Sequence, residues 1–106
     1  MATKQSTVDF LVDQMRDAGQ IRSRKMFGEY AIYCNGKVVA LVCDDCLFVK
    51  PTVSGRNFIR NVTEAPPYPN AKLHFLIEED RWEDLEWLSE LIKKTCAELP
   101  EPKRKK

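Results

Sequence analysis

An Asn35-Gly36 pair between two apolar runs is the feature that most constrains this chain. Both residues of a two-residue hairpin turn must accept a positive φ, which asparagine and glycine do readily. The pair therefore predicts two antiparallel strands, one from Arg24 to Cys34 and the other from Lys37 to Cys43.

A second turn is predicted directly after this hairpin, at Asp44-Asp45. The third strand then covers Cys46–Lys50, and Pro51 ends it because proline lacks the N–H that a ladder needs. Gly28 is expected to mark a bend or bulge inside the first strand.

Helical segments are expected on both sides of this three-stranded unit, over residues 6–18, 55–60 and 80–98. Ser6 is the expected N-cap of the first, and Gly19 the left-handed residue that stops it. Thr52 or Ser54 is the expected cap of the second. A strand over Lys72–Ile77 completes a two-layer α+β domain with an antiparallel sheet.

Pairing across the first turn places Ile32 opposite Val39 and Tyr30 opposite Leu41. With this register both faces of the sheet are apolar, although an antiparallel sheet with one wet face alternates apolar and polar residues. We infer a homodimer contact on the second face. The alternative is that a helix or the C-terminal segment wraps round to cover it. Aromatic residues supply the interface candidates, which are Phe10, Tyr30, Phe48 and Trp87.

Composition excludes several classes of function. The formal net charge is +1, so no whole-molecule field favours nucleic acid or an anionic membrane. No apolar run approaches the roughly 18 residues of a membrane span, and the N-terminus lacks a signal-peptide pattern. We therefore expect a cytoplasmic protein without a membrane partner, whose four cysteines stay reduced.

The Cys43-x-x-Cys46 spacing is the main candidate for chemistry. A thioredoxin-type thiol is activated at a helix N-terminus, whereas this pair flanks a turn with two carboxylates. A structural zinc site would need Cys96 and His74 to reach the same turn. No nucleophile–base pair or phosphate-binding glycine loop is present. The expectation is no catalytic residue, no metal and no cofactor.

Basic residues form the remaining candidate binding group. They precede the first strand and close the chain, and are Arg22, Arg24, Lys25, Lys103, Arg104, Lys105 and Lys106. Phosphate contacts from such groups give weak, salt-sensitive nucleic-acid binding. A solvated charged surface explains the same residues equally well.

One stretch carries a family resemblance. Its residues are Arg24-Lys25-Met26-Phe27-Gly28-Glu29-Tyr30, Asn35-Gly36-Lys37, Ala40-Leu41-Val42 and Leu47-Phe48-Val49-Lys50. They resemble the TfoX (Sxy) N-terminal domain family over residues 8–99, and depart from it at Glu29, where that family has a second glycine. The resemblance implies a secretion-chaperone-like fold of order α-β3-α-β2-α, with a short fourth strand at Pro67–Asn70.

Full-length members of that family regulate bacterial competence genes and carry a second, helical domain. The resemblance therefore implies a stand-alone member or a fragment. We expect residues 1–99 to form one domain and 100–106 to be a basic disordered tail, because Pro100 and Pro102 end the last helix. It brings no catalytic residues. The function expected is a non-enzymatic regulatory module that acts through an unidentified protein partner. Weak nucleic-acid binding is the alternative.

Overall fold

The computed structural model describes residues 3–26 and 29–100. In chain order its helices and strands are α1 (Gln5–Gln14), β1 (Ile21–Met26), β2 (Glu29–Cys34), β3 (Lys37–Cys43), β4 (Cys46–Val49), α2 (Val53–Ile59), β5 (Thr63–Ala65), β6 (His74–Ile77) and α3 (Leu85–Glu98). Short 3-10 turns precede β1 and α3, at Arg16–Ala18 and Glu79–Arg81. The predicted α+β class with an antiparallel sheet is confirmed.

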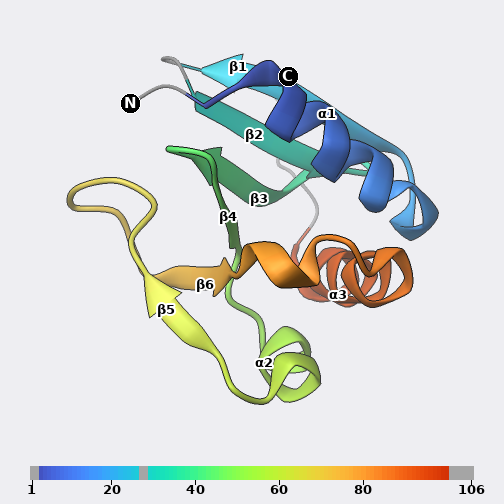
Figure 1. Ribbon diagram of the computed structural model, residues 1–106. Coiled ribbons are helices and arrows are strands. Elements are labelled where there is room, and N and C mark those ends of the chain that lie inside the picture. Colours follow the sequence, from blue (N-terminus) through green and yellow to red (C-terminus); the bar gives the residue numbers. More distant parts are fainter. Residues whose placement is uncertain (1–2, 27–28, 101–106) are drawn as a thin grey trace, which may run out of the picture.

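One antiparallel six-stranded sheet runs in the order β1-β2-β3-β4-β6-β5. The helices α1 and α3 lie together on one face of it, and α2 packs beside α3 (Figure 1). The core fills the space between this face and the helices, and its largest fully buried side chains include Leu11, Ile32, Phe75, Leu88 and Leu91. We call this the inner face, and the opposite one the outer face.

The turn prediction at Asn35-Gly36 is confirmed, with φ values of 52° and 86°. Asp44 and Asp45 form the second turn with φ values of 54° and 58°. These two turns set the ends of β3, whose predicted and observed bounds are the same. Short turns with positive φ at both residues match the twist of the flanking strands, which explains why the sequence alone predicted the positions of these strands.

The prediction of one strand from Arg24 to Cys34 is wrong. Two strands stand there instead, because β1 and β2 pair antiparallel with Met26 opposite Glu29. The first group therefore has four strands, where the resemblance implied three. The bend expected at Gly28 lies outside the described residues.

The fourth strand expected at Pro67–Asn70 is also misplaced. Thr63–Ala65 forms the edge strand β5, and 66–73 connects it to β6. Prolines at 66, 67 and 69 explain this, because a residue without an N–H cannot donate to the ladder.

The expected helix ends need correction at two places. Lys4 occupies the N-cap position of α1 without a side-chain bond, so Ser6 lies inside the helix. Gly19 has φ 151° and ψ −155°, which is not the left-handed helical conformation. The α-helix has already ended at Gln14.

The register across the first hairpin differs from the expected one by a β-bulge. Cys34 pairs with Lys37 and Tyr33 with Val38, but Ile32 pairs with Ala40, so Val39 is an extra residue in β3. A one-residue shift moves every later side chain to the other face of a strand. Leu41 therefore faces outward, away from Tyr30.

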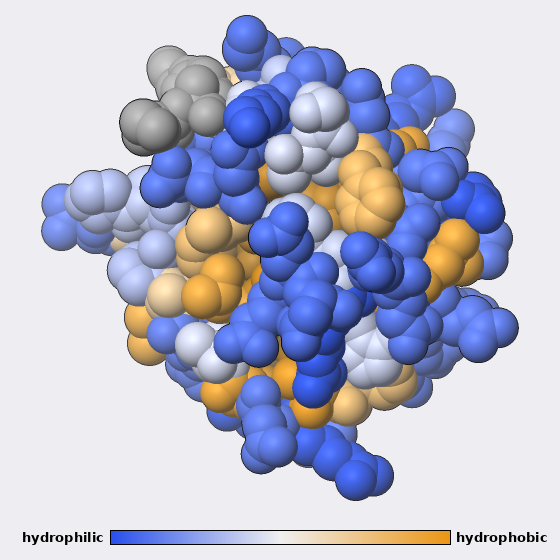
Figure 2. Space-filling model, in the orientation of Figure 1, coloured by the Kyte–Doolittle hydropathy of each residue, from blue (hydrophilic) through white to orange (hydrophobic). Residues whose placement is uncertain are grey.

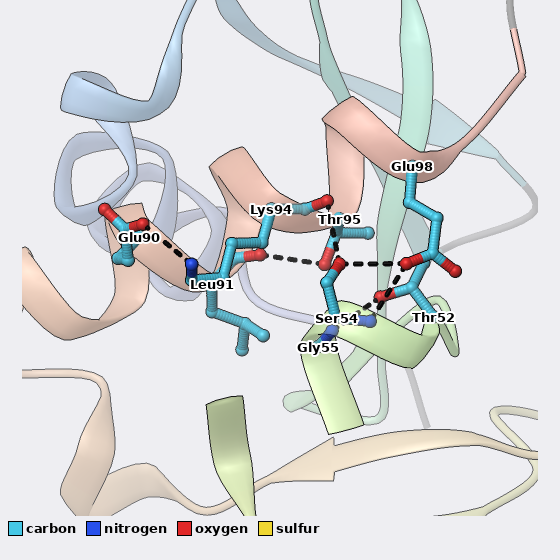
Figure 3. Close-up of polar contacts among 8 residues, drawn as sticks. All are labelled: Thr52, Ser54, Gly55, Glu90, Leu91, Lys94, Thr95 and Glu98. Carbon is cyan, nitrogen blue, oxygen red and sulfur yellow. Dashed lines mark hydrogen bonds and ion pairs between the residues drawn. The ribbon is translucent and has the colours of Figure 1, made fainter. Parts of the chain in front are cut away.

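Glu98 joins the end of α3 to the start of α2 (Figure 3). Its carboxylate accepts the N–H groups of Val53 at 2.8 Å and Ser54 at 2.9 Å, and the Ser54 hydroxyl at 2.9 Å. The Thr52 hydroxyl caps the same helix by accepting the Gly55 N–H at 3.0 Å, as predicted. Two residues thus satisfy the free amide groups of the first turn of α2.

These bonds make stability depend on pH. The backbone N–H groups of Ser54 and Val53 and the Ser54 hydroxyl hold the pKa of Glu98 below its ordinary value. A depressed folded-state pKa adds stability above the unfolded-state pKa, and that stability is lost as the pH falls through the folded value. We expect Glu98→Gln to melt at a lower temperature than wild type at neutral pH, with the gap closing below about pH 4. Thermal melts across this range measure it, and a constant gap would contradict the assignment.

Candidate functional site

The outer face of the sheet carries an uncharged row across its centre. Strand pairing places Ala31 beside Leu41, Leu41 beside Phe48, and Phe48 beside Leu76. Both α1 and α3 pack on the other side of the sheet, so these side chains lie outside the core that the helices cover (Figure 1). The expectation that both faces are apolar is thus met, although the bulge changes which residues lie on each.

The β5–β6 loop reaches the outer face at the end of the sheet where β2 starts. A hollow of about 440 Å³ is lined there by Met26, Glu29, Tyr30, Leu41, Cys43 and Tyr68. Tyr68 comes from the loop and is 57% exposed, and Met26 is 40% exposed. Figure 2 shows hydrophobic residues gathered beside this loop, on the left of the view. Neither a helix nor the described part of the C-terminal segment supplies this lining.

Arginines border the other end of the outer face. Arg22 pairs with Tyr33 and Arg24 with Ala31, so both guanidinium groups share the face of the uncharged row. Lys25 pairs with Tyr30 and has the opposite orientation along the strand. The tail residues named with them as nucleic-acid candidates, 103–106, lie outside the described residues.

The four aromatic interface candidates occupy different surroundings. Phe48 lies in the uncharged row and is 7% exposed, whereas Tyr30 belongs to the core and its hydroxyl donates to Gln5 Oε1 at 2.7 Å. Trp87 stacks on Phe58 of α2 with ring centroids 5.6 Å apart. Phe10 is 42% exposed on α1. Only Phe48 therefore lies on the face for which a contact was inferred.

Trp87 also has a cationic neighbour. The Arg81 guanidinium lies 4.6 Å from the centre of the Trp87 ring, and Lys94 lies 5.6 Å from that of Phe58. Cations stacked on aromatic faces are held by the ring quadrupole. This ladder joins α2 to α3 within one chain and gives Trp87 a packing role.

The Cys43-x-x-Cys46 turn is held by the N-terminal segment. Asp45 Oδ1 accepts the Lys4 N–H at 2.9 Å and the Thr7 hydroxyl at 3.0 Å. Glu29 accepts the Asp44 N–H at 3.0 Å. The residue that departs from the family pattern therefore supports this turn.

Both thiols of that turn are poorly ionised. Burial, together with the nearby charges of Glu29 and Asp44 and the Cys46 thiol, raises the pKa of Cys43 to about 11. Burial and then Asp44 raise the pKa of Cys46 as well. The thiolate is the nucleophile in disulfide exchange, so these surroundings oppose thiol chemistry near neutral pH.

The remaining zinc candidates do not meet at this turn. Cys96 lies against Cys34 instead, with its thiol donating to the Cys34 carbonyl oxygen at 3.3 Å. His74 is 9% exposed and its Nδ1 lies 3.0 Å from the Lys72 carbonyl oxygen. Among the residues that the structure describes, no group of three or more His, Cys, Asp or Glu side chains is placed to hold a metal ion.

Sequence reasoning missed three residues that shape the outer face, namely Met26, Tyr33 and Tyr68. Tyr33 and Met26 were placed on a single long strand, so their neighbours in β1 and β2 were not visible. Tyr68 stands between prolines, and that composition predicts a loop without saying where the loop packs.

Comparison with known proteins identifies a matching family and a relative. The family model of the TfoX N-terminal domain matches residues 13–99. An uncharacterized 12.7 kDa protein in the trpE 5′ region of Spirochaeta aurantia is 41% identical over 106 residues, which cover 100% of this chain and 91% of that protein. In the described part of the chain no helix is long and apolar enough to cross a membrane.

Proposed function

Because the chain belongs to the TfoX N-terminal domain family, we propose that it is a non-enzymatic regulatory module. It acts through protein contacts in the transcriptional regulation of competence-type genes, in the cytoplasm and as a homodimer. The family supports the regulatory role. The outer face of the sheet supports the contact.

The observation that carries the proposal is the uncharged row on the outer face together with the hollow at its edge. Leu41, Phe48 and Leu76 form its centre, and the exposed Met26 and Tyr68 side chains stand at its edge. A two-fold contact brings one patch against a second copy of itself, so the apolar side chains at its centre oppose no like charges. The charged residue that lines the hollow at its edge, Glu29, accepts the Asp44 N–H. Aromatic and methionine side chains at such an edge are typical contact residues.

Oligomeric state in solution tests this contact. We expect light scattering coupled to size-exclusion chromatography to give the mass of a dimer for wild type and of a monomer for Met26→Lys and Tyr68→Lys. A lysine in the contact would bury an unpaired charge. Val53→Lys is the matched control, because Val53 is 69% exposed on α2, outside this face. A monomeric wild type, or a dimer that survives both lysine changes, contradicts the proposal.

Transcript levels test the regulatory role separately. In cells that carry this gene, we expect deletion to lower the transcripts of DNA-uptake genes, and restored wild type to raise them again. Met26→Lys and Tyr68→Lys should fail to restore them, whereas Val53→Lys should succeed. Unchanged transcripts on deletion would reject the regulatory role even if the dimer forms.

Phe10 is our candidate for the contact with the further protein partner. It lines a shallow hollow with Trp82 and the acidic side chains of Glu79 and Glu83. An exposed aromatic ring with carboxylates at its rim suits a partner that presents an apolar side chain flanked by basic groups.

A further inference from the structure

We propose that the arginine-bordered end of the outer face binds single-stranded nucleic acid. The site is a hollow of about 340 Å³ lined by Gln20, Arg22, Ser23, Arg24, Tyr33 and Gly36. This inference goes beyond the proposed function and does not rest on it.

Arg22 and Arg24 are placed to hold phosphates. They are two residues apart on the edge strand β1, so their side chains leave the same face about 7 Å apart. Both are exposed, and the ion pairs among residues 3–26 and 29–100 involve neither of them. A guanidinium group offers a planar fork of donors that matches two phosphate oxygens.

Tyr33 supplies a ring beside these charges. It pairs directly with Arg22, is half-buried and lines the hollow. Stacking on such a ring binds any base, because every base has a π face. The pair thus combines a phosphate contact with a base contact at one position of the sheet.

The shape of the site favours a single strand over a duplex. Duplex DNA is read by a helix or a β-ribbon that enters a groove, and here both long helices lie on the inner face (Figure 1). A sheet surface with an aromatic ring and flanking cations suits bases that are already unstacked.

The end of α3 is bound to the residue that follows Gly36. Lys37 Nζ donates to the carbonyl oxygens of Cys96 and Leu99, both at 2.9 Å. The basic run 103–106 follows Pro100 closely in the sequence. Tail contacts with phosphates add affinity without sequence preference.

Lys25 takes no part in the site, although the sequence grouped it with the two arginines. Its side chain leaves β1 on the inner side, as the alternation along a strand requires. A Lys25→Glu chain should therefore bind nearly as well as wild type.

Fluorescence anisotropy with a labelled oligothymidylate measures the binding, at about 50 mM and about 200 mM salt. We expect Arg22→Glu with Arg24→Glu to weaken binding at least about tenfold. Arg60→Glu with Lys72→Glu is the matched control, because it makes the same change in net charge at two exposed residues elsewhere. An equal loss in the control overturns the assignment of the site.

Variants of Tyr33 distinguish base stacking from electrostatic attraction to phosphates. We expect Tyr33→Phe to bind like wild type, and Tyr33→Leu, which keeps an apolar side chain but no ring, to bind about five- to hundredfold more weakly. Thermal melts confirm that each variant folds. Equal binding by Tyr33→Leu overturns the base contact.

Three further results would also overturn the proposal. One is a duplex of the same length that binds as tightly as the single strand. Another is binding that is lost when residues 103–106 are removed but kept in the Arg22→Glu, Arg24→Glu variant, which would assign the binding to the tail alone. The third is a phosphoserine peptide that binds the arginines while the oligothymidylate does not.

Discussion

Phe75→Ala should lower the free energy of unfolding by about 3–5 kcal/mol, the range for truncating a large buried aromatic side chain. Phe75 is 1% exposed and lies on the inner face of β6, opposite Val49 of β4. The Arg56 guanidinium of α2 lies 5.3 Å from the centre of its ring. The ring therefore fills the space between the sheet and α2, and its removal leaves a cavity that both would have to close.

Urea denaturation measures this loss. Leu73→Ala is the control, because Leu73 stands two residues earlier and is 51% exposed. We expect the control to stay within about 0.5 kcal/mol of wild type. A Phe75→Ala loss below about 2 kcal/mol would show that the core beneath α2 relaxes to fill the space.

Gly55→Ala should also destabilise the fold, by about 1–3 kcal/mol, although alanine is the better helix former. A Cβ atom at this position would lie 2.7 Å from Thr52 Oγ1, which is too close for the two atoms to keep their places. Thr52 is 7% exposed, so its hydroxyl can move only by giving up the bond that caps α2. The lost cap and the crowding together outweigh the gain in propensity of about 1 kcal/mol.

A double-mutant cycle identifies the cause. In a Thr52→Ala background the clashing oxygen is absent, so Gly55→Ala should cost much less there than in wild type. Asn57→Ala, an exposed change in the same helix, should be neutral or slightly stabilising. An equal cost of Gly55→Ala in both backgrounds would point to Leu91 and Phe75, each with an atom 3.5 Å from the added carbon.

Turns and helix caps, which depend on residues close together in the chain, could be predicted from the sequence. Two residues with positive φ set each turn of the β2–β3–β4 unit, and a threonine hydroxyl caps α2, so turn and cap chemistry alone locates these elements. The antiparallel α+β class follows from the same signals.

Three features could not be predicted from the sequence, each for a physical reason. β1 is an edge strand with five of its six residues exposed, so it has no apolar alternation to reveal it. The bulge in β3 falls in a run of apolar residues, Val38-Val39-Ala40, where every register buries something apolar. Trp87 lies off the buried stripe of α3, and its packing partner Phe58 belongs to α2, so the pattern of α3 alone does not predict this contact.

The candidate site depends on the features that could not be predicted from the sequence. Arg22 and Tyr33 become neighbours only because β1 and β2 form a hairpin, and Leu41 reaches the outer face only because Val39 is an extra residue. The basic residues could be grouped from the sequence, but the side of β1 that each one occupies could not.

The strand order of the sheet also bears on how the chain acquires its structure during synthesis. Strands β1 to β4 pair in the order in which they leave the ribosome, and each pair needs only a turn or short connection to close. The pairing of β4 with β6 skips β5 in the chain, so it cannot form until α2, β5 and β6 have been synthesised. Pairings between sequence neighbours close quickly because little chain entropy is lost. The first half of the sheet can therefore assemble while the ribosome is still translating α3, and its exposed inner face needs protection until that helix is complete.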